Sequence, residues 1–450
     1  TKRQRKKEMK NKIVDIIGGG LAGAECAYQL AEAGFKVNLY EMKPTKFSPA
    51  HKQPTLAEIV CSNSFKNDDV LSSSGLLKAE MRELGSLVLR VADKCRVPSG
   101  NALRVDREQF TKQIDNIIRS HPNITVVEQE ITKVPVNADN ICVVATGPLT
   151  SDALMQNLSA LLGEESLYFF DASAPIVLAS SLDKTKCFVE DRYGTVGEGD
   201  YLNCPMNKAE YTTFVKELVN AKTVELKDFE NSQVFEGCMP IEVMAKRGEN
   251  SLRFGPLKPV GLGNHLAEKP YAIVQLRKED IEEESYNMVG FQTNLLYGEQ
   301  KRVFSLIPAL KNAEIIKYGV MHRNSYINAP KHLNCNYSLR KAPNIYFAGQ
   351  LSGVEGYMES ASSGLVVAKS IIFGYNNNER LCFPCNTMLG AIANYISNPA
   401  NEHNFQPMNS NYGIIKKPDG KFTDKKLLRE AIYKNSIAEI DKIKEINKWN

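Results

Sequence analysis

The sequence predicts an α/β fold built on a doubly wound, mostly parallel sheet, with a smaller α+β domain inserted into it. Three apolar strands that run into glycine turns predict the sheet, at 13–18, 141–147 and 345–349. Continuous apolar runs of this kind are typical of parallel strands that are buried on both faces. Between the second and third runs, short strand-like stretches separated by Gly and Pro indicate a separate inserted unit.

The first glycine turn has the spacing of a dinucleotide-binding motif, G-x-G-x-x-G, at Gly18, Gly20 and Gly23. The first glycine permits a tight turn, the second lets a pyrophosphate approach the backbone N–H groups, and the third lets the helix pack closely on the strand. Glu41 ends the next strand 21 positions after Gly20, close to the ~20 expected for an acid that binds the adenosine ribose. The alternative is an α/β turn without a nucleotide. The residues expected to hold the cofactor here are Gly18, Gly19, Gly20, Leu21, Ala22, Gly23 and Glu41.

The third strand leads into a second glycine turn that contains Gly349 and Gly353. A helix start at this place would close the same ligand site from the far end of the chain. We therefore expect both glycines to contribute to cofactor binding.

The remaining elements follow from apolar periodicity. Helices are expected at 20–33, 75–93, 106–119, 208–218, 360–372 and 424–448. Further strands are expected at 37–40, 124–127, 251–254, 271–276 and 286–289. The expected domains are a basic tail at 1–12, a discontinuous main domain at 13–198 and 330–450, and the inserted domain at 199–329.

Charge and hydropathy restrict the setting of the protein. The net charge is only +4 over 450 residues, yet Lys and Arg crowd the first twelve positions. Such a run is either a solvated tail or a contact for RNA. The sequence holds no run of 18 apolar residues and no leader-like start, so we expect a cytoplasmic protein without membrane spans.

The ten cysteines are mostly scattered, which favours reduced thiols over a disulfide framework. Cys382 and Cys385 have C-x-x-C spacing but lack the second ligand pair of a zinc site, so no metal is expected. Cys61 and Cys238 stand among small or turn-forming residues and are the candidate nucleophiles. The alternative for each is a small buried apolar side chain.

Segments along nearly the whole chain resemble the TrmFO family, the folate- and flavin-dependent RNA uracil-5-methyltransferases. The segments that carry the resemblance lie at 17–25, 39–44, 48–51, 58–64, 75–82, 105–107, 170–177, 235–242, 346–360 and 405–409. The resemblance implies an FAD-binding, glutathione-reductase-like main domain. It also implies an enzyme in which NADH or NADPH reduces FAD, methylenetetrahydrofolate supplies the carbon, and a uridine in RNA receives it at C5.

The resemblance also implies roles for three residues. Cys238 matches the cysteine that attacks C6 of uracil, and Cys61 matches the one associated with the flavin-bound methylene, as a protecting partner or an acid/base. The division of roles between the two cysteines stays open. Tyr357 matches the aromatic that stacks folate over the flavin, with a core tyrosine as the alternative.

The RNA partner has two candidates under this resemblance, the T-loop uridine of tRNA, which we favour, and 23S ribosomal RNA. Two other functions compete with it. One is an FAD-dependent oxidoreductase of a small molecule that needs no RNA, and the other is an RNA-binding module that keeps a flavin for structure only.

Overall fold

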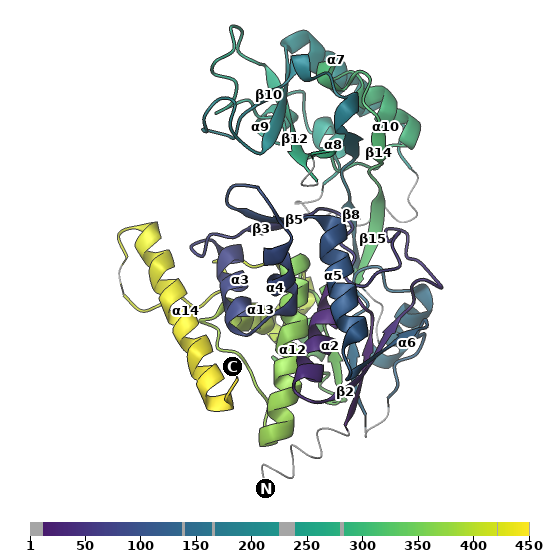
Figure 1. Cartoon of the computed structure of the whole chain (residues 1–450), viewed down its shortest axis with the longest axis vertical. Coiled ribbons are helices and arrows are strands. Elements are labelled where there is room, and N and C mark those ends of the chain that lie inside the picture. Colours follow the sequence, from purple (N-terminus) through teal and green to yellow (C-terminus); the bar gives the residue numbers. More distant parts are fainter. Residues whose placement is uncertain are drawn as a thin grey trace.

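The computed structural model describes residues 12–136, 140–163, 167–224, 239–279, 283–420 and 422–449. The basic tail expected at 1–12 therefore lies almost wholly outside the described residues. The chain forms two lobes, a larger one built from the first and last parts of the described chain and a smaller one built from its middle (Figure 1).

The larger lobe is organised around a five-stranded parallel sheet in the order β16-β7-β1-β2-β6. Its strands are β1 (Ile13–Ile17), β2 (Lys36–Glu41), β6 (Ile124–Glu128), β7 (Ile141–Val144) and β16 (Ile345–Phe347). The chain moves from β1 to β2 on one side and returns to β7 on the other, so the topological switch point lies beside β1. Ligands of doubly wound sheets bind at this point, beyond the carboxyl ends of the strands. The predicted fold class is confirmed.

Helices cover both faces of this sheet, and two of them, α2 and α12, pack against each other (Figure 1). Their bounds, with those of the other helices of the larger lobe, are α2 (Leu21–Glu32), α3 (Ser73–Glu83), α4 (Leu87–Lys94), α5 (Arg107–Ser120), α6 (Asp152–Leu162), α11 (Ala329–His332), α12 (Tyr357–Asn377), α13 (Met388–Ser397) and α14 (Lys425–Asn447).

The single helix expected at 75–93 is wrong, because the chain forms α3 and α4 with a turn between them. Gly85 has a φ of 75°, a left-handed conformation that glycine adopts without strain. Ser86 then caps α4 by accepting a hydrogen bond from the Leu89 N–H at 3.3 Å. The apolar spacing continues through the turn, so periodicity alone did not reveal the break.

The smaller lobe contains a six-stranded sheet in the order β10-β11-β12-β13-β9-β14, in which all neighbouring strands are antiparallel. Its strands are β9 (Ile176–Leu178), β10 (Phe188–Val189), β11 (Tyr201–Met206), β12 (Ala272–Lys278), β13 (Ser285–Met288) and β14 (Ile315–Lys317). The helices of this lobe are α7 (Lys208–Asn220), α8 (Ile241–Lys246), α9 (Ser251–Phe254) and α10 (Tyr297–Phe304). Since β9 and β10 precede residue 199, this sheet starts earlier in the chain than the expected boundary.

The strand expected at 251–254 is also wrong, because these residues form α9. The Ser251 hydroxyl donates to the carbonyls of Met244 and Gly248 at 2.7 Å, which turns the chain back on α8. Four apolar-alternating residues fit a strand and a single helical turn equally well.

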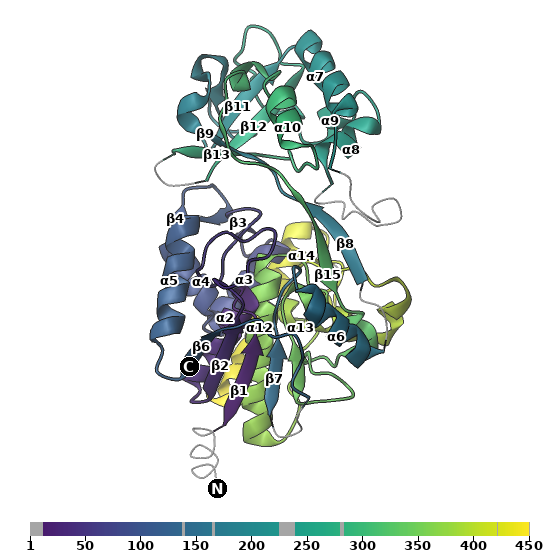
Figure 2. The same ribbon diagram turned by 90° about the vertical axis from the view of Figure 1, so that its right-hand side faces the viewer.

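Two long strands connect the lobes (Figure 2). β8 (Leu167–Ala172) and β15 (Met321–Tyr326) form an antiparallel pair that spans the space between them. A small sheet of β3 (Ser64–Asn67), β5 (Ala102–Val105) and β4 (Arg96–Val97) lies on the side of the larger lobe that faces the smaller one.

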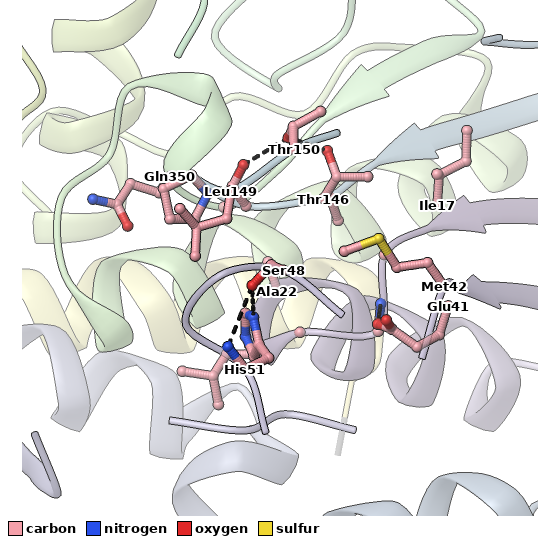
Figure 3. Close-up of a pocket in the computed structure, with 18 of the residues that line it drawn as sticks. Ile17, Ala22, Glu41, Met42, Ser48, His51, Thr146, Leu149, Thr150 and Gln350 are labelled. Atoms are coloured by element: carbon pink, nitrogen blue, oxygen red, sulfur yellow. Dashed lines mark hydrogen bonds between the residues drawn. The ribbon is translucent and has the colours of Figure 1, made fainter. Parts of the chain in front are cut away.

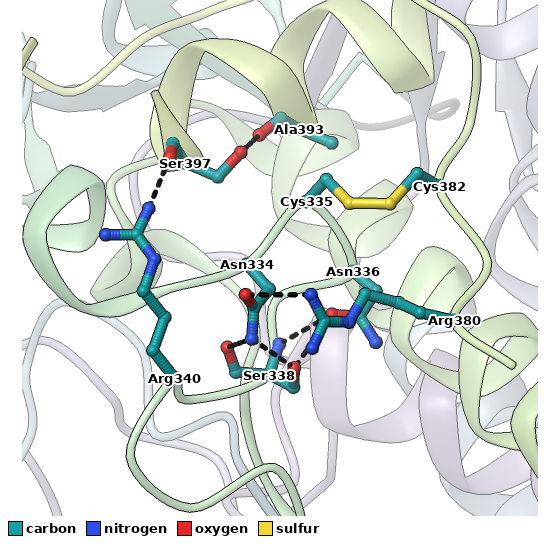
Figure 4. Close-up of a disulfide and its surroundings, with 9 residues drawn as sticks. All are labelled: Asn334, Cys335, Asn336, Ser338, Arg340, Arg380, Cys382, Ala393 and Ser397. Atoms are coloured by element: carbon teal, nitrogen blue, oxygen red, sulfur yellow. Dashed lines mark hydrogen bonds between the residues drawn. A yellow bond between two sulfur atoms is a disulfide. The ribbon is translucent and has the colours of Figure 1, made fainter. Parts of the chain in front are cut away.

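The structure corrects the expectation that the cysteines are all reduced. Cys335 and Cys382 form a disulfide, with Cα atoms 5.6 Å apart (Figure 4). The two residues are 47 positions apart in sequence, whereas Cys385, the near neighbour of Cys382, is a free thiol. The disulfide partner of Cys382 is thus a cysteine distant in sequence, for which the sequence offered no local pattern.

Within the described residues, no helix is both long enough and apolar enough to span a membrane. The same part of the chain contains no group of three or more His, Cys, Asp or Glu side chains arranged to hold a metal ion.

Candidate cofactor and thiol site

A long cleft lies at the switch point of the parallel sheet, with about 1270 Å³ of empty space including its mouth. Figure 3 shows side chains from the β1 turn, the loop after β2, the Thr146–Thr150 turn and the Gln350 segment around it. The predicted site residues that line the cleft are Gly18, Gly19, Gly20, Leu21, Ala22, Glu41, Cys61, Gly349 and Tyr357.

The three motif glycines differ in what surrounds them. Gly18 has a φ of 102°, and a Cβ there would lie 2.5 Å from the Ala145 carbonyl oxygen. A Cβ on Gly23 would lie 1.8 Å from the Gly18 carbonyl oxygen. By contrast, a Cβ on Gly20 would meet no atom of the described chain within 4 Å. The first and third glycines are thus needed by the protein itself, and the space over Gly20, at the start of α2, fits a pyrophosphate.

Glu41 lies in the same cleft and is buried. Its carboxylate accepts hydrogen bonds from the Gly19 N–H at 2.9 Å and the Lys43 N–H at 3.0 Å. A carboxylate has about four acceptor sites, so acceptor capacity remains for a ribose hydroxyl. Glu41 therefore ties the glycine turn to β2 whether or not a ligand is bound.

The second glycine turn contributes one of its two predicted residues to the cleft. Gly349 has a φ of 75°, and its N–H donates to the Ser363 hydroxyl of α12 at 2.7 Å. Gly353 is not among the residues that line the cleft. A Cβ on Gly353 would lie 2.3 Å from the ring of Phe405, so this glycine makes room for packing.

Cys61 and Tyr357 meet at the wall of the cleft although 296 positions separate them. The Tyr357 phenol oxygen accepts the Cys61 N–H at 2.7 Å and the Ser62 N–H at 3.3 Å. The tyrosine ring also packs edge-on against Phe65, with centroids 5.9 Å apart. Burial, with the nearby Cys61 charge, raises the pKa of Tyr357 far above its usual value, so the phenol stays protonated and holds the Cys61 backbone in place.

Two cationic side chains contact the backbone directly before Cys61. Lys317, at the end of β14, donates to the Val60 carbonyl at 2.5 Å. Arg107, at the start of α5, donates to the Ile59 and Val60 carbonyls at 3.1 and 3.3 Å. Glu279 pairs with Arg107 at 2.9 Å. The loop that carries Cys61 is thus held from both lobes.

Matches to known proteins decide the family. Residues 13–379 match the family model described as GIDA, glucose inhibited division protein A. A relative from Acetivibrio thermocellus, named methylenetetrahydrofolate–tRNA-(uracil-5-)-methyltransferase TrmFO, is 51% identical over 433 residues, which are 96% of this chain and 98% of the relative. A relative of the same name from Halalkalibacterium halodurans is 49% identical over 428 residues, 95% of this chain and 97% of the relative. This chain belongs to the TrmFO family of methyltransferases.

The solved structures agree on the fold. GidA from Aquifex aeolicus superimposes with a TM-score of 0.70 in one crystal form and 0.69 in another, at 14% identity. The first match covers 98% of this chain and 74% of the GidA chain. The two-lobed arrangement is therefore common to this TrmFO-family chain and to GidA.

Cys238, the other candidate nucleophile of this TrmFO-family chain, lies outside the described residues. The described chain resumes at Met239, next to the start of α8. There the Ile241 N–H donates to the Gln292 carbonyl at 2.7 Å. The structure therefore does not relate the Cys238 thiol to the cleft.

Several residues of the site are not among the predicted site residues. Ser48 and His51 line the cleft, and the hydroxyl of Ser48 lies 2.5 Å from Nδ1 of His51 (Figure 3). Burial and then the Lys43 ammonium lower the pKa of His51, so its imidazole is neutral near pH 7. As a loop histidine after Pro49 and Ala50, His51 could be expected to face the cofactor, with a solvated side chain as the alternative. Only the resemblance segment at 105–107 pointed toward Arg107, and nothing in the sequence pointed to Lys317.

Proposed function

We propose that this chain methylates C5 of a uridine in tRNA, with FAD as cofactor, methylenetetrahydrofolate as carbon donor and NADH or NADPH as reductant. The observation that carries the proposal is the shared cleft, in which a dinucleotide cradle and Cys61 lie together in a chain that matches a TrmFO relative over 96% of its residues. The names of the relatives specify tRNA. We further propose the T-loop uridine as the target and the cytoplasm as the place of action.

The residues of the cleft would divide the work of holding the cofactor. The open backbone at Gly20 would bind the pyrophosphate of FAD, Glu41 would bind its ribose, and Gly349 would contact it from the opposite side. When bound, FAD would carry the reducing equivalents and the one-carbon unit. Tyr357 would hold the Cys61 loop at the cleft wall, and it is also the proposed contact for folate.

The target uracil needs activation because its C5 is not nucleophilic. In the proposal the Cys238 thiolate adds to C6, forming a carbon–sulfur bond and an enolate that is nucleophilic at C5. After C5 has received the one-carbon unit it would lose its proton, and the thiolate would leave C6. The resulting methylene group would then need a hydride equivalent to become the methyl group, which NADH or NADPH would supply through the flavin. Cys61 would act on the cofactor side, as a protecting partner or an acid/base.

The test is to incubate the purified protein with FAD, NADH or NADPH, labelled methylenetetrahydrofolate and RNA. Two substrates are compared, a tRNA transcript and a 23S ribosomal RNA fragment, and 5-methyluridine is measured in each. We expect label in the tRNA, at the T-loop uridine. Label only in the ribosomal fragment would move the proposal to that substrate, and label in neither despite bound FAD would refute it.

Cysteine variants test the assignment of the thiols. Cys238→Ala and Cys61→Ala are expected to retain bound FAD and to make no 5-methyluridine. Cys385→Ala is the matched control, because Cys385 is a free thiol outside the cleft lining. If Cys238→Ala is fully active, Cys238 is not the nucleophile.

A further inference from the structure

The surroundings of Cys61 carry more positive than negative charge. Arg107 is neutralised by Glu279, whose side chain is only 5% exposed. Lys317 makes no ion pair with a carboxylate of the described residues. A cation that leaves bulk water without an opposite charge is costly for the fold. The charged cluster of Arg107, Lys317 and Glu279 therefore carries one positive charge that no carboxylate in it balances.

The thiol of Cys61 is placed to supply the balancing negative charge. Lys317 and Arg107 converge from different lobes on the carbonyl of Val60, the residue that precedes Cys61. Both cations interact electrostatically with Cys61. Tyr357 holds the amide on the other side of the same peptide bond at 2.7 Å, so the loop cannot swing the thiol away from the cations without breaking these bonds.

We propose that Lys317, together with Arg107, is a positioning residue that keeps Cys61 as a thiolate at the wall of the cofactor cleft. The inference rests on the proposed function only in taking Cys61 as a reacting thiol. A thiolate is the nucleophilic form of cysteine, and adjacent Lys and Arg side chains favour it. Lys317 thereby acts through Cys61 and needs no contact with the substrate.

The other charged groups of the cluster fix its pH behaviour. Tyr357 remains a neutral phenol. Burial and the neighbouring Arg107 lower the pKa of Lys317 to about 8. Lys52 also opposes the charge of Lys317, while Glu279 supports it. Lys317 is thus charged at neutral pH and loses its charge above about pH 8, where Arg107 alone remains beside the thiol.

The test measures the reactivity of Cys61 directly, without methyl transfer. The FAD-loaded protein is treated briefly with iodoacetamide between pH 5 and 10. The tryptic peptide 53–66, in which Cys61 is the single cysteine, is then quantified by mass spectrometry. Alkylation forms the S–C bond and releases iodide. We expect Lys317→Met to raise the pH midpoint of Cys61 alkylation by about one unit or more, a roughly tenfold loss of rate at pH 6.

Three further variants separate charge from structure. Lys317→Arg is expected to restore the midpoint, and Glu279→Gln, which removes the negative charge, is expected to shift it downward. Lys311→Met, at an exposed position six residues earlier, is the matched control and is expected to leave the midpoint unchanged.

The proposal is overturned if Lys317→Met has the wild-type midpoint. If Lys317→Met does not fold, a Glu279→Gln midpoint at or above the wild-type value overturns it. Absence of methyl transfer with these shifts present would refute the proposed function and leave this inference standing.

Discussion

At the scale of single residues, the glycines of the first turn serve two different purposes. One is required for the packing of the protein itself, and another leaves space for the cofactor. Gly23 is in contact with the Gly18 carbonyl, so any side chain there would push α2 away from β1. Gly20 faces open space at the N-terminus of the same helix. Because the two positions lie three residues apart, substituting each of them tests the two purposes separately.

We predict that Gly20→Ala leaves the FAD-free protein nearly as stable as the wild type, with a cost of at most about 1 kcal/mol at the helix N-cap. It should weaken FAD binding at least about tenfold, which corresponds to ~1.4 kcal/mol. Gly23→Ala should destabilise the FAD-free protein by about 1–3 kcal/mol through overpacking. Thermal melting without FAD and flavin titration measure the two effects, and equal destabilisation of the FAD-free protein by both variants would contradict this division.

The sequence could predict the site residues that local structure positions, but not those that are brought in by contacts between distant segments. The positions of Gly18, Gly20, Gly23 and Glu41 follow from spacing within one βαβ unit, where local structure fixes the geometry. Lys317 lies 256 positions after Cys61 and reaches it only because β14 of the second lobe packs near the Cys61 loop. A single lysine in a short strand carries no local pattern that would reveal such a contact.

At the scale of elements, one buried carboxylate joins three helices of the larger lobe. Glu80 of α3 accepts hydrogen bonds from the Met388 and Leu389 N–H groups at the start of α13, at 2.6 and 2.8 Å. It also accepts from the Ser436 hydroxyl of α14 at 2.5 Å. Burial raises the pKa of Glu80 to about 7 in spite of these donors. The C-terminal helix is thus anchored through Ser436 to a residue of the core.

We predict a pH-dependent stability that originates at Glu80. Its pKa of about 7 in the folded state lies above the ordinary glutamate value of 4.5, so the folded state binds more protons between these values and stability falls as pH rises from about 4.5 to 7. The loss is on the order of 3 kcal/mol at 1.36 kcal/mol per unit. In melts between pH 4.5 and 8, Glu80→Gln should lack this loss, with Glu83→Gln on the exposed side of α3 as the control. A constant difference in Tm between wild type and Glu80→Gln would contradict it.

The disulfide is the other link that joins distant segments of the larger lobe. It closes a span of 47 residues, and a loop of this size gives about 4 kcal/mol of stabilisation in the chain-entropy model. We expect reduction by dithiothreitol, or Cys335→Ser, to lower the free energy of unfolding by that amount. Cys385→Ser should have little effect in the same unfolding experiment. Unchanged melting on reduction would show that the link does not contribute.

Elements were predicted best where a long periodic pattern or a buried parallel strand determined them. β1, β7 and α5 correspond to the sequence expectation because each has a continuous apolar run or an amphipathic stripe. The break at Gly85 and the single turn of α9 were missed, because an isolated glycine and a four-residue segment are decided by capping and tertiary contacts.

At the scale of the whole molecule, the two lobes meet on the loop that carries Cys61. Asn63 donates to the Glu279 carbonyl at 2.8 Å, and Arg277 donates to the Ser62 hydroxyl at 2.7 Å. Arg104 of β5 donates to the Lys278 carbonyl at 2.8 Å. The end of β12 therefore clamps the thiol loop, whereas the glycine cradle belongs to the larger lobe alone. A substitution that breaks the hydrogen bonds between the end of β12 and the Cys61 loop should therefore displace the thiol without weakening cofactor binding.

We predict that Asn63→Ala separates thiol placement from cofactor binding. Asn63 is fully buried, and removal of its amide leaves the Glu279 carbonyl without that donor, at a cost of about 1–3 kcal/mol. FAD binding should stay close to the wild-type value, because no cradle residue is touched. Methyl transfer should fall roughly tenfold or more, since small displacements of a reacting group cost that much. Asn123→Ala, which removes a 3.1 Å hydrogen bond from a half-buried amide to the Ala31 carbonyl within the larger lobe, is the control for loss of an asparagine amide. A parallel loss of FAD binding and activity in Asn63→Ala would show instead that the lobes act as one rigid unit.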